Sequence, residues 1–440
     1  MVDFGSDAVG ALPPNGFLHS LSSLAPRGEK YQELIAALSI GAWRIGDVRQ
    51  ADAPLQIGAR TTVLLYDSWR DRLPRSEAMR WPYDDFAAFE GWLRPLVRAN
   101  RRLPIVWEVW NEWDLGLPWW GGTEAQLFET YALAERIVRE EVGELGVVAG
   151  PSFARFDTAR FRRFADYCVR AGCQVNAWTW HEIAQGHSGD IATRVRWVRD
   201  SIASNPKYRA LQVRSLDVNE VMSRSERYSS GSLVTALRGL YDGGADAFAR
   251  SCWQEFRSRE YECSNASLDG IVDATHDAPR VGWWVHAAYA RIREAPVESH
   301  GGERAVALAG RGHRASDAAL VLVANTVAAV PSDSIVIELR RLDMSAPRAG
   351  RAEHRRIVVR RLPWKSLDLP LDSLPLEAEY LVAFDAPLVR LRLPALATER
   401  ISTNPADVLV GRDAYLVSIE PVVPFRSKSW PVGLRSGSRP

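Results

Sequence analysis

The sequence of 440 residues has few of the features that mark membrane, nucleic-acid-binding or disulfide-rich proteins. No stretch reaches the roughly 18 uninterrupted apolar residues of a membrane-spanning helix. A formal net charge of +1 argues against a nucleic-acid or anionic-membrane partner. Only four residues are cysteine, too few for a disulfide scaffold and without zinc-site spacing, so we expect reduced thiols. These are Cys168, Cys173, Cys252 and Cys263.

The amino terminus has neither a positively charged segment nor a long apolar run, the two marks of a secretory leader. We therefore expect a cytoplasmic protein, or a secreted or periplasmic one if a leader has been removed. Hydrophobic residues make up 46% of the chain and charged residues 25%, which is typical of an ordinary globular protein.

The composition changes near residue 300. Fifteen of the seventeen tryptophans and all four cysteines come before it, whereas short runs rich in Val, Leu and Ile follow it. This change predicts two domains, residues 1–298 and 299–440. Strand-like runs with alternating polarity, such as 334–339 and 388–393, predict that the second domain is a β-sandwich.

The first domain alternates strand-like and helical segments. Leu127, Tyr131, Ala134 and Val138 recur at helical spacing behind a capping box of Thr123 and Gln126. Eight candidate strands alternate with such segments, which is the number and order of elements in a (β/α)8 barrel of the TIM type. An open doubly wound sheet is the alternative, but no glycine-rich phosphate motif follows the first strand. The expected strands are 16–21, 42–48, 61–67, 105–110, 146–149, 175–180, 215–218 and 247–252.

Two glutamates stand where the fourth and seventh strands of such a barrel end. Glu112 follows the apolar run that begins at Ile105, and Glu220 follows the run that begins at Ser215. Active sites of these barrels lie at the carboxyl ends of the strands, so both side chains are expected at the mouth. Asp217, three residues before Glu220, is expected to point to the opposite side of the sheet because strand residues alternate.

Two such carboxylates are what a retaining glycoside hydrolase needs, with their reacting groups ~5 to 5.5 Å apart. The field of an ionised Glu220 keeps the proton on Glu112, and forming the glycosyl ester removes that field. We therefore assign Glu112 as acid/base and Glu220 as nucleophile. This chemistry requires neither a cofactor nor a metal, and its partner is an oligosaccharide or polysaccharide.

The segment from Trp110 to Asp114, with a second glutamate at the seventh strand, resembles the clan A glycoside hydrolases. The barrel-plus-sandwich layout resembles family 39, which includes β-xylosidases and exopolysaccharide endoglycosidases. The resemblance implies that Asn111 binds the 2-hydroxyl of the sugar, that His181 lines the subsite and that Trp253 forms an aromatic floor.

Other residues near the expected strand ends are candidates for substrate binding. They are Arg44, His19, Tyr66, Trp69, Trp113, Trp180 and Glu182. Arg44 is equally a candidate for an ion pair that orients one of the catalytic glutamates. Two rival functions stay open at this point: an endo-acting hydrolase of a bacterial exopolysaccharide, and a non-catalytic carbohydrate-binding barrel.

Overall fold

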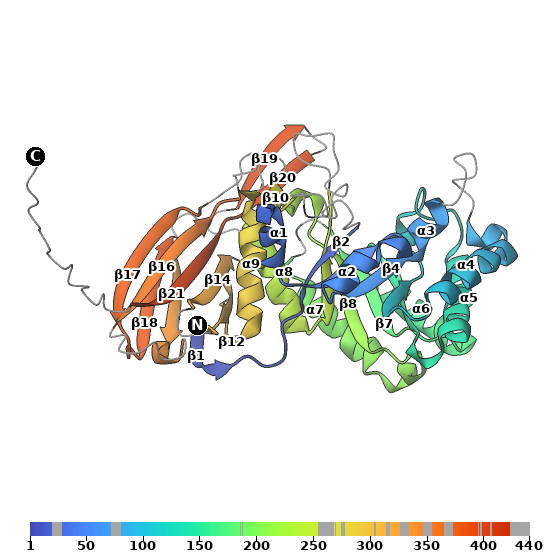
Figure 1. Ribbon diagram of the computed structural model, residues 1–440, viewed down its shortest axis with the longest axis horizontal. Helices are drawn as coiled ribbons and strands as arrows, with labels where there is room; N and C mark the ends of the chain where they lie inside the picture. The colour runs from blue at the N-terminus through green and yellow to red at the C-terminus, as the bar shows by residue number, and fades with distance from the viewer. Residues whose placement is uncertain are drawn as a thin grey trace, which may run out of the picture.

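The computed structural model describes most of the chain and shows two bodies that lie side by side (Figure 1). The described residues are 1–19, 29–71, 81–184, 186, 188–253, 268, 270–273, 278–302, 305–313, 317–325, 334–345, 354–364, 373–394, 396, 398–404 and 407–422. In this part of the chain no helix combines the length and the apolar character needed to cross a membrane.

The first body is an eight-stranded parallel sheet whose strands follow the chain order. Its two edge strands approach so closely that a Cβ on Gly16 would lie 1.6 Å from the carbonyl oxygen of Phe248, so the sheet forms a nearly closed barrel. The expected (β/α)8 barrel is therefore confirmed. The strands are β2 (Asn15–Leu18), β3 (Ile40–Ile45), β4 (Arg60–Leu64), β5 (Ile105–Glu108), β6 (Val147–Phe153), β7 (Ala177–Glu182), β8 (Ser215–Val221) and β9 (Ala247–Arg250).

Helices surround the barrel and bury their apolar stripes against its strands. The capping box expected at Thr123 and Gln126 is present at the start of α5, where each side chain bonds the other residue's backbone amide. The helices are α1 (Glu29–Ala36), α2 (Asp52–Gln56), α3 (Leu65–Asp71), α4 (Phe86–Asn100), α5 (Glu124–Val142), α6 (Thr158–Ala171), α7 (Ile191–Val198), α8 (Ser230–Gly243) and α9 (Val281–Glu294).

The second body contains two sheets with an apolar core between them, consistent with the expected sandwich. One sheet has the order β12-β1-β15-β18 and the other β13-β14-β21-β16-β17. The strands are β12 (Val297–Ser299), β13 (Ala305–Gly310), β14 (Ala319–Asn325), β15 (Ser334–Arg340), β16 (His354–Leu362), β17 (Leu376–Ala383), β18 (Leu388–Pro394) and β21 (Ala414–Val422). Two short pairs complete the described strands: β10 (Val272–Asp273) with β11 (Ala278–Pro279), and β19 (Glu399–Asn404) with β20 (Asp407–Gly411).

The amino-terminal strand β1 (Val2–Asp7) lies in the sandwich, although the change in composition assigned residues 1–298 to the barrel. Val2 pairs with Ser299 on one side and with Leu339 on the other. Val2 and Phe4 are fully buried in the sandwich core, so a short alternating segment at the start of the chain closes the second domain. A composition average does not detect so short a strand.

Helices α8 and α9 lie between the barrel and the sandwich (Figure 1). The Arg238 guanidinium of α8 donates to the carbonyl oxygens of Ser299 and Ala307, at 2.6 and 2.9 Å. At the start of α8 the Gly231 amide donates to the carbonyl oxygen of Arg412, at 2.9 Å. The carboxy-terminal domain is therefore fixed to α8, the helix that follows strand β8.

The cysteines differ from the expectation that all four are reduced. Cys168 and Cys173 are free and buried, but Cys252 is disulfide-bonded. Cys263 lies outside the described residues. A count of four does not reveal which cysteines the fold brings together, since that depends on loop paths after β9.

Candidate active site

Glu112 is presented by a strained turn at the end of β5. Its backbone has φ 46°, in the left-handed region that side-chain-bearing residues seldom adopt. Its amide donates to the carbonyl oxygen of Ser152 on β6, at 3.0 Å, which holds the turn in place. Such strain is concentrated at functional sites, where the surrounding structure stabilises it. The carboxyl group is 8% exposed.

Glu220 owes its orientation to a β-bulge in β8. Trp180 pairs with Val218 and His181 pairs with Glu220, so β8 carries one extra residue, Asn219, against β7. Asn219 and Glu220 both bond side chains inside the barrel, whereas a regular strand turns only one of two successive residues inward.

Asp217 lies inside the barrel, contrary to the expectation from strand alternation. Its carboxylate is bound by Arg60 across the barrel at 2.8 Å, and Arg60 begins β4, the third strand of the sheet. The bulge at Asn219 reverses the alternation between Asp217 and Glu220. Asp217 therefore contributes to the barrel interior and does not line the cavity described below.

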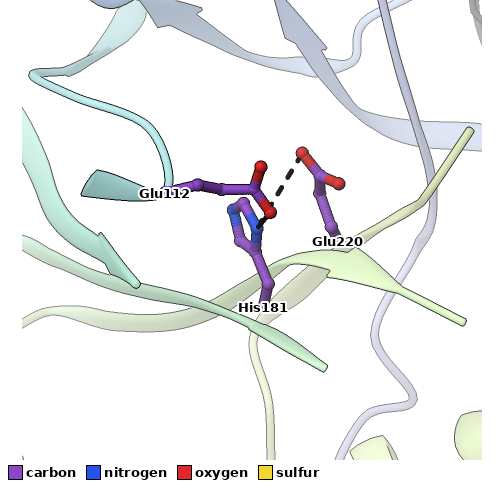
Figure 2. Close-up of side chains that lie close together, drawn as sticks. All are labelled: Glu112, His181 and Glu220. Carbon is purple, nitrogen blue, oxygen red and sulfur yellow. Dashed lines mark hydrogen bonds and ion pairs between the residues drawn. The ribbon is translucent and has the colours of Figure 1, made fainter. Parts of the chain in front are cut away.

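The two glutamates meet above the ring of His181. The nearest ligand atoms of the three side chains all lie within 4.8 Å of one another. The Nδ1 atom of His181 is 3.1 Å from Glu112 Oε1 and 3.9 Å from Glu220 Oε1. Figure 2 shows the two carboxyl groups reaching toward each other from opposite sides, with the imidazole beneath. This separation is close to the ~5 Å of retaining glycosidases and shorter than that of inverting ones.

Arg44 of β3 joins the site to the barrel interior. Its guanidinium donates to Glu108 at 2.6 Å, to Glu220 at 2.9 Å and to Asn111 Oδ1 at 2.7 Å. The side chain of Arg44 is only 5% exposed. Of the two roles expected for this residue, the structure shows the ion pair with Glu220, which orients that carboxylate. The bond to Asn111 also turns that amide's oxygen toward Arg44.

The charges of the site act on one another in a buried environment. Burial raises the pKa of Glu220, and so does neighbouring Glu112, while His181 and Arg44 act in the opposite direction. Burial lowers the pKa of His181, but Glu220 and Glu112 outweigh it and raise that pKa above its usual value. The site therefore favours a protonated imidazole between two carboxyl groups.

A cavity of about 430 Å³ opens over the two glutamates, within the range of small-molecule sites. Besides the two glutamates, four of the predicted residues line it: His19, Arg44, Asn111 and Trp253. His181 contacts both carboxyl groups but does not line the cavity. His19 is neutral at pH 7, because burial and Arg44 lower its pKa to about 4.

Besides His181, five predicted substrate-binding residues do not line this cavity. Trp69 packs edge-on against Phe89 and Trp92, and Trp113 packs against Phe128 and Phe153. Trp180 is fully buried and donates to Glu182, which is also paired with Arg194 of α7 at 2.6 Å. Tyr66 is buried and packs against Trp110 and Trp119. The prediction is corrected for these side chains, since a strand end alone does not decide whether a residue faces the mouth or the helices.

Sequence reasoning also missed two charged residues that line the cavity. Asp67 and Arg224 add a carboxylate and a guanidinium to it, and Trp119 adds an aromatic face. Asp67 belongs to no recognisable motif. It does lie on the first turn of α3, directly after β4, and residues that follow a barrel strand are expected at the mouth of the barrel. Leu64 and Cys252 complete the lining with the residues already named.

The trio of Glu112, His181 and Glu220 is also the only group of three possible metal ligands within the described residues. The residues present do not suit a divalent cation well. Arg44 already places a positive charge 2.9 Å from Glu220, and this charge repels a cation at that carboxylate.

Solved structures that include a GH39 enzyme and a glucosidase share this architecture over nearly the whole chain. The fold is similar to the GH39 enzyme of Xanthomonas axonopodis pv. citri, with a TM-score of 0.63 and 15% identity, covering 96% of this chain and 97% of that one. It is similar to a glucosidase of Croceicoccus marinus, with a TM-score of 0.64 and 14% identity, covering 96% and 98%. It is also similar to N2152 of Neocallimastix frontalis, with a TM-score of 0.67 and 17% identity, covering 96% of this chain and 98% of that one.

No family model matches the sequence, and no curated protein matches it. The expected resemblance to family 39 is thus confirmed at the level of the fold. Because the identities are 17% or lower, the likeness leaves the activity to be argued from the site.

Proposed function

We propose that this protein is a retaining glycoside hydrolase that cleaves a β-linked glycoside with Glu112 as acid/base and Glu220 as nucleophile. The observation that carries the proposal is the pair of carboxyl groups within 4.8 Å of each other beneath a cavity. The glycoside hydrolase fold of the structural neighbours supports it, as does the aromatic lining of Trp119 and Trp253, which suits the apolar faces of sugar rings.

In the first step the Glu220 carboxylate attacks the anomeric carbon, the glycosidic bond breaks, and Glu112 gives its proton to the departing oxygen. In the second step the Glu112 carboxylate takes a proton from water, which attacks the same carbon and releases Glu220. Two displacements at one carbon retain its configuration. His181 holds Glu112 in place through both steps by its 3.1 Å contact.

The remaining side chains of the cavity bind and orient the sugar in this proposal. Arg44 holds the side-chain oxygen of Asn111, so the amide nitrogen of Asn111 is directed to the 2-hydroxyl of the sugar. His19 lines the wall of the cavity as a neutral ring. The two tryptophans stack on sugar faces. A cavity of about 430 Å³ suits a short glycoside. The two-carboxylate reaction itself requires no metal or cofactor.

The proposal is tested by trapping the covalent intermediate. A panel of aryl β-glycosides identifies a hydrolysed sugar, and the matching 2-deoxy-2-fluoro glycoside is then used with mass spectrometry of the peptides. We expect an adduct on Glu220 and a loss of at least about 10³-fold in kcat for Glu220→Gln.

The matched control is Glu182→Gln, which neutralises another buried glutamate on the neighbouring strand β7. Its carboxylate pairs with Arg194 outside the cavity, so kcat is expected to stay close to that of the parent protein. An adduct on another carboxylate, or a product of inverted configuration, contradicts the assignment of Glu220.

A further inference from the structure

Glu108 is a third carboxylate at the site, and it takes no part in the two-step mechanism. It is the last residue of β5, four residues before Glu112, and its side chain is fully buried. It does not line the cavity, so it does not touch the sugar. A buried carboxylate without a function is costly to keep, because removing the charge from water carries a large penalty.

Both oxygens of Glu108 hold groups that contact or adjoin the nucleophile. Oε2 accepts from the Nε of Arg44 at 2.6 Å, and Oε1 accepts from the side-chain Nδ2 of Asn219 at 2.5 Å. Arg44 in turn donates to Glu220 at 2.9 Å, and Asn219 is the bulge residue directly before Glu220. Glu108 therefore fixes Glu220 by two routes, one through a side chain and one through the backbone.

Arg44 carries one positive charge and divides it between two carboxylates. Without Glu108, the whole charge would act on Glu220 and make it a weaker base. A weaker base is a poorer nucleophile in the first step but a better leaving group in the second step. The charge of Glu108 thus balances the two halves of the reaction.

We propose that Glu108 is a positioning residue: it anchors Arg44 and Asn219 around the nucleophile, and its charge limits how far Arg44 neutralises Glu220. This inference rests on the proposed glycosidase function. It adds to that function a residue that acts only through its neighbours.

The test is Glu108→Gln, which keeps the shape and removes the charge. We expect the acidic limb of the kcat/KM profile to move to lower pH by about one unit. We also expect slower formation of the 2-fluoroglycosyl adduct but faster turnover of that adduct once it has formed. Glu108→Asp restores the charge, so its acidic limb is expected to return toward that of the parent protein.

The control is Asp217→Asn, which removes another buried carboxylate that is bound to an arginine inside the same barrel. Arg60 binds it at 2.8 Å, away from the cavity, so stability falls but the acidic limb stays in place. An unchanged acidic limb in Glu108→Gln, or equal slowing of both steps, overturns the role of Glu108. Failure of the parent protein to label on Glu220 overturns instead the proposed function.

Discussion

Replacing Arg44 by methionine removes a guanidinium that touches two buried carboxylates. Arg44 is 5% exposed and bonds Glu108 at 2.6 Å and Glu220 at 2.9 Å, so Arg44→Met leaves both acids without their guanidinium partner. Breaking a buried ion pair from one side costs about 3–5 kcal/mol in the free energy of unfolding. We expect a loss in this range at pH 7.

The loss should depend on pH in a definite direction. Burial already raises the pKa of Glu220, and Arg44 opposes that, so Arg44→Met raises the pKa further above its unfolded value. A folded state that binds more protons than the unfolded one is favoured at low pH. The stability lost in Arg44→Met should therefore be smallest below about pH 4.5 and should grow as the pH rises through the folded-state pKa.

The assay is urea unfolding followed by tryptophan fluorescence at pH 5 and pH 7, with parallel measurement of kcat/KM. The control is Arg98→Met, since Arg98 pairs with Glu141 but is 58% exposed, and its unfolding midpoint should hardly change. A loss below about 1 kcal/mol, or a loss that is equal at both pH values, would refute the argument that Arg44 compensates buried charge.

Two further predictions concern the histidine and the domain contact. Burial raises the pKa of Glu220, and His181, 3.9 Å away, opposes this increase when its ring is protonated. We therefore expect His181→Asn to move the acidic limb of the kcat/KM profile to higher pH. An acidic limb that does not move would contradict this prediction. At Gly231 a Cβ would lie 2.7 Å from the Asp413 carbonyl oxygen, so Gly231→Ala should cost about 1–3 kcal/mol in thermal unfolding. The control is Gly91→Ala, where the added Cβ meets open space, so its free energy of unfolding should stay the same or increase. An equal loss of stability in both variants would refute the clash at Gly231.

The architecture could be predicted well from local patterns. Apolar runs such as Ile105–Glu108 and the capping box of Thr123 and Gln126 depend on near neighbours in the chain, and these signals located strands and helices correctly. Their number and alternation then limited the choice to a barrel. The strand β1 was missed because its partners, Ser299 and Leu339, lie some 300 residues away in the sequence.

The candidate site could be predicted only in part. Glu112 and Glu220 were found because one follows β5 and the other lies near the end of β8, and strand ends converge at a barrel mouth. Trp180 and Glu182 are the neighbours of His181 on β7, and strand alternation turns them toward the helices instead of the mouth, which their position near a strand end does not reveal. Asp67 and Arg224 each follow a strand of the barrel closely, but neither belongs to a motif that singles it out in the sequence.

The sequence by itself determined the barrel and the position of the two glutamates at its mouth, because strands and their carboxyl ends can be recognised from short, local patterns. Only the tertiary structure decided how the charges are shared. The chain brings together Arg44, Glu108, Glu112, His181 and Glu220 from four strands and the turn that follows β5, and electrostatic interaction depends on distances of a few ångströms in a buried environment. No spacing along the chain encodes those distances.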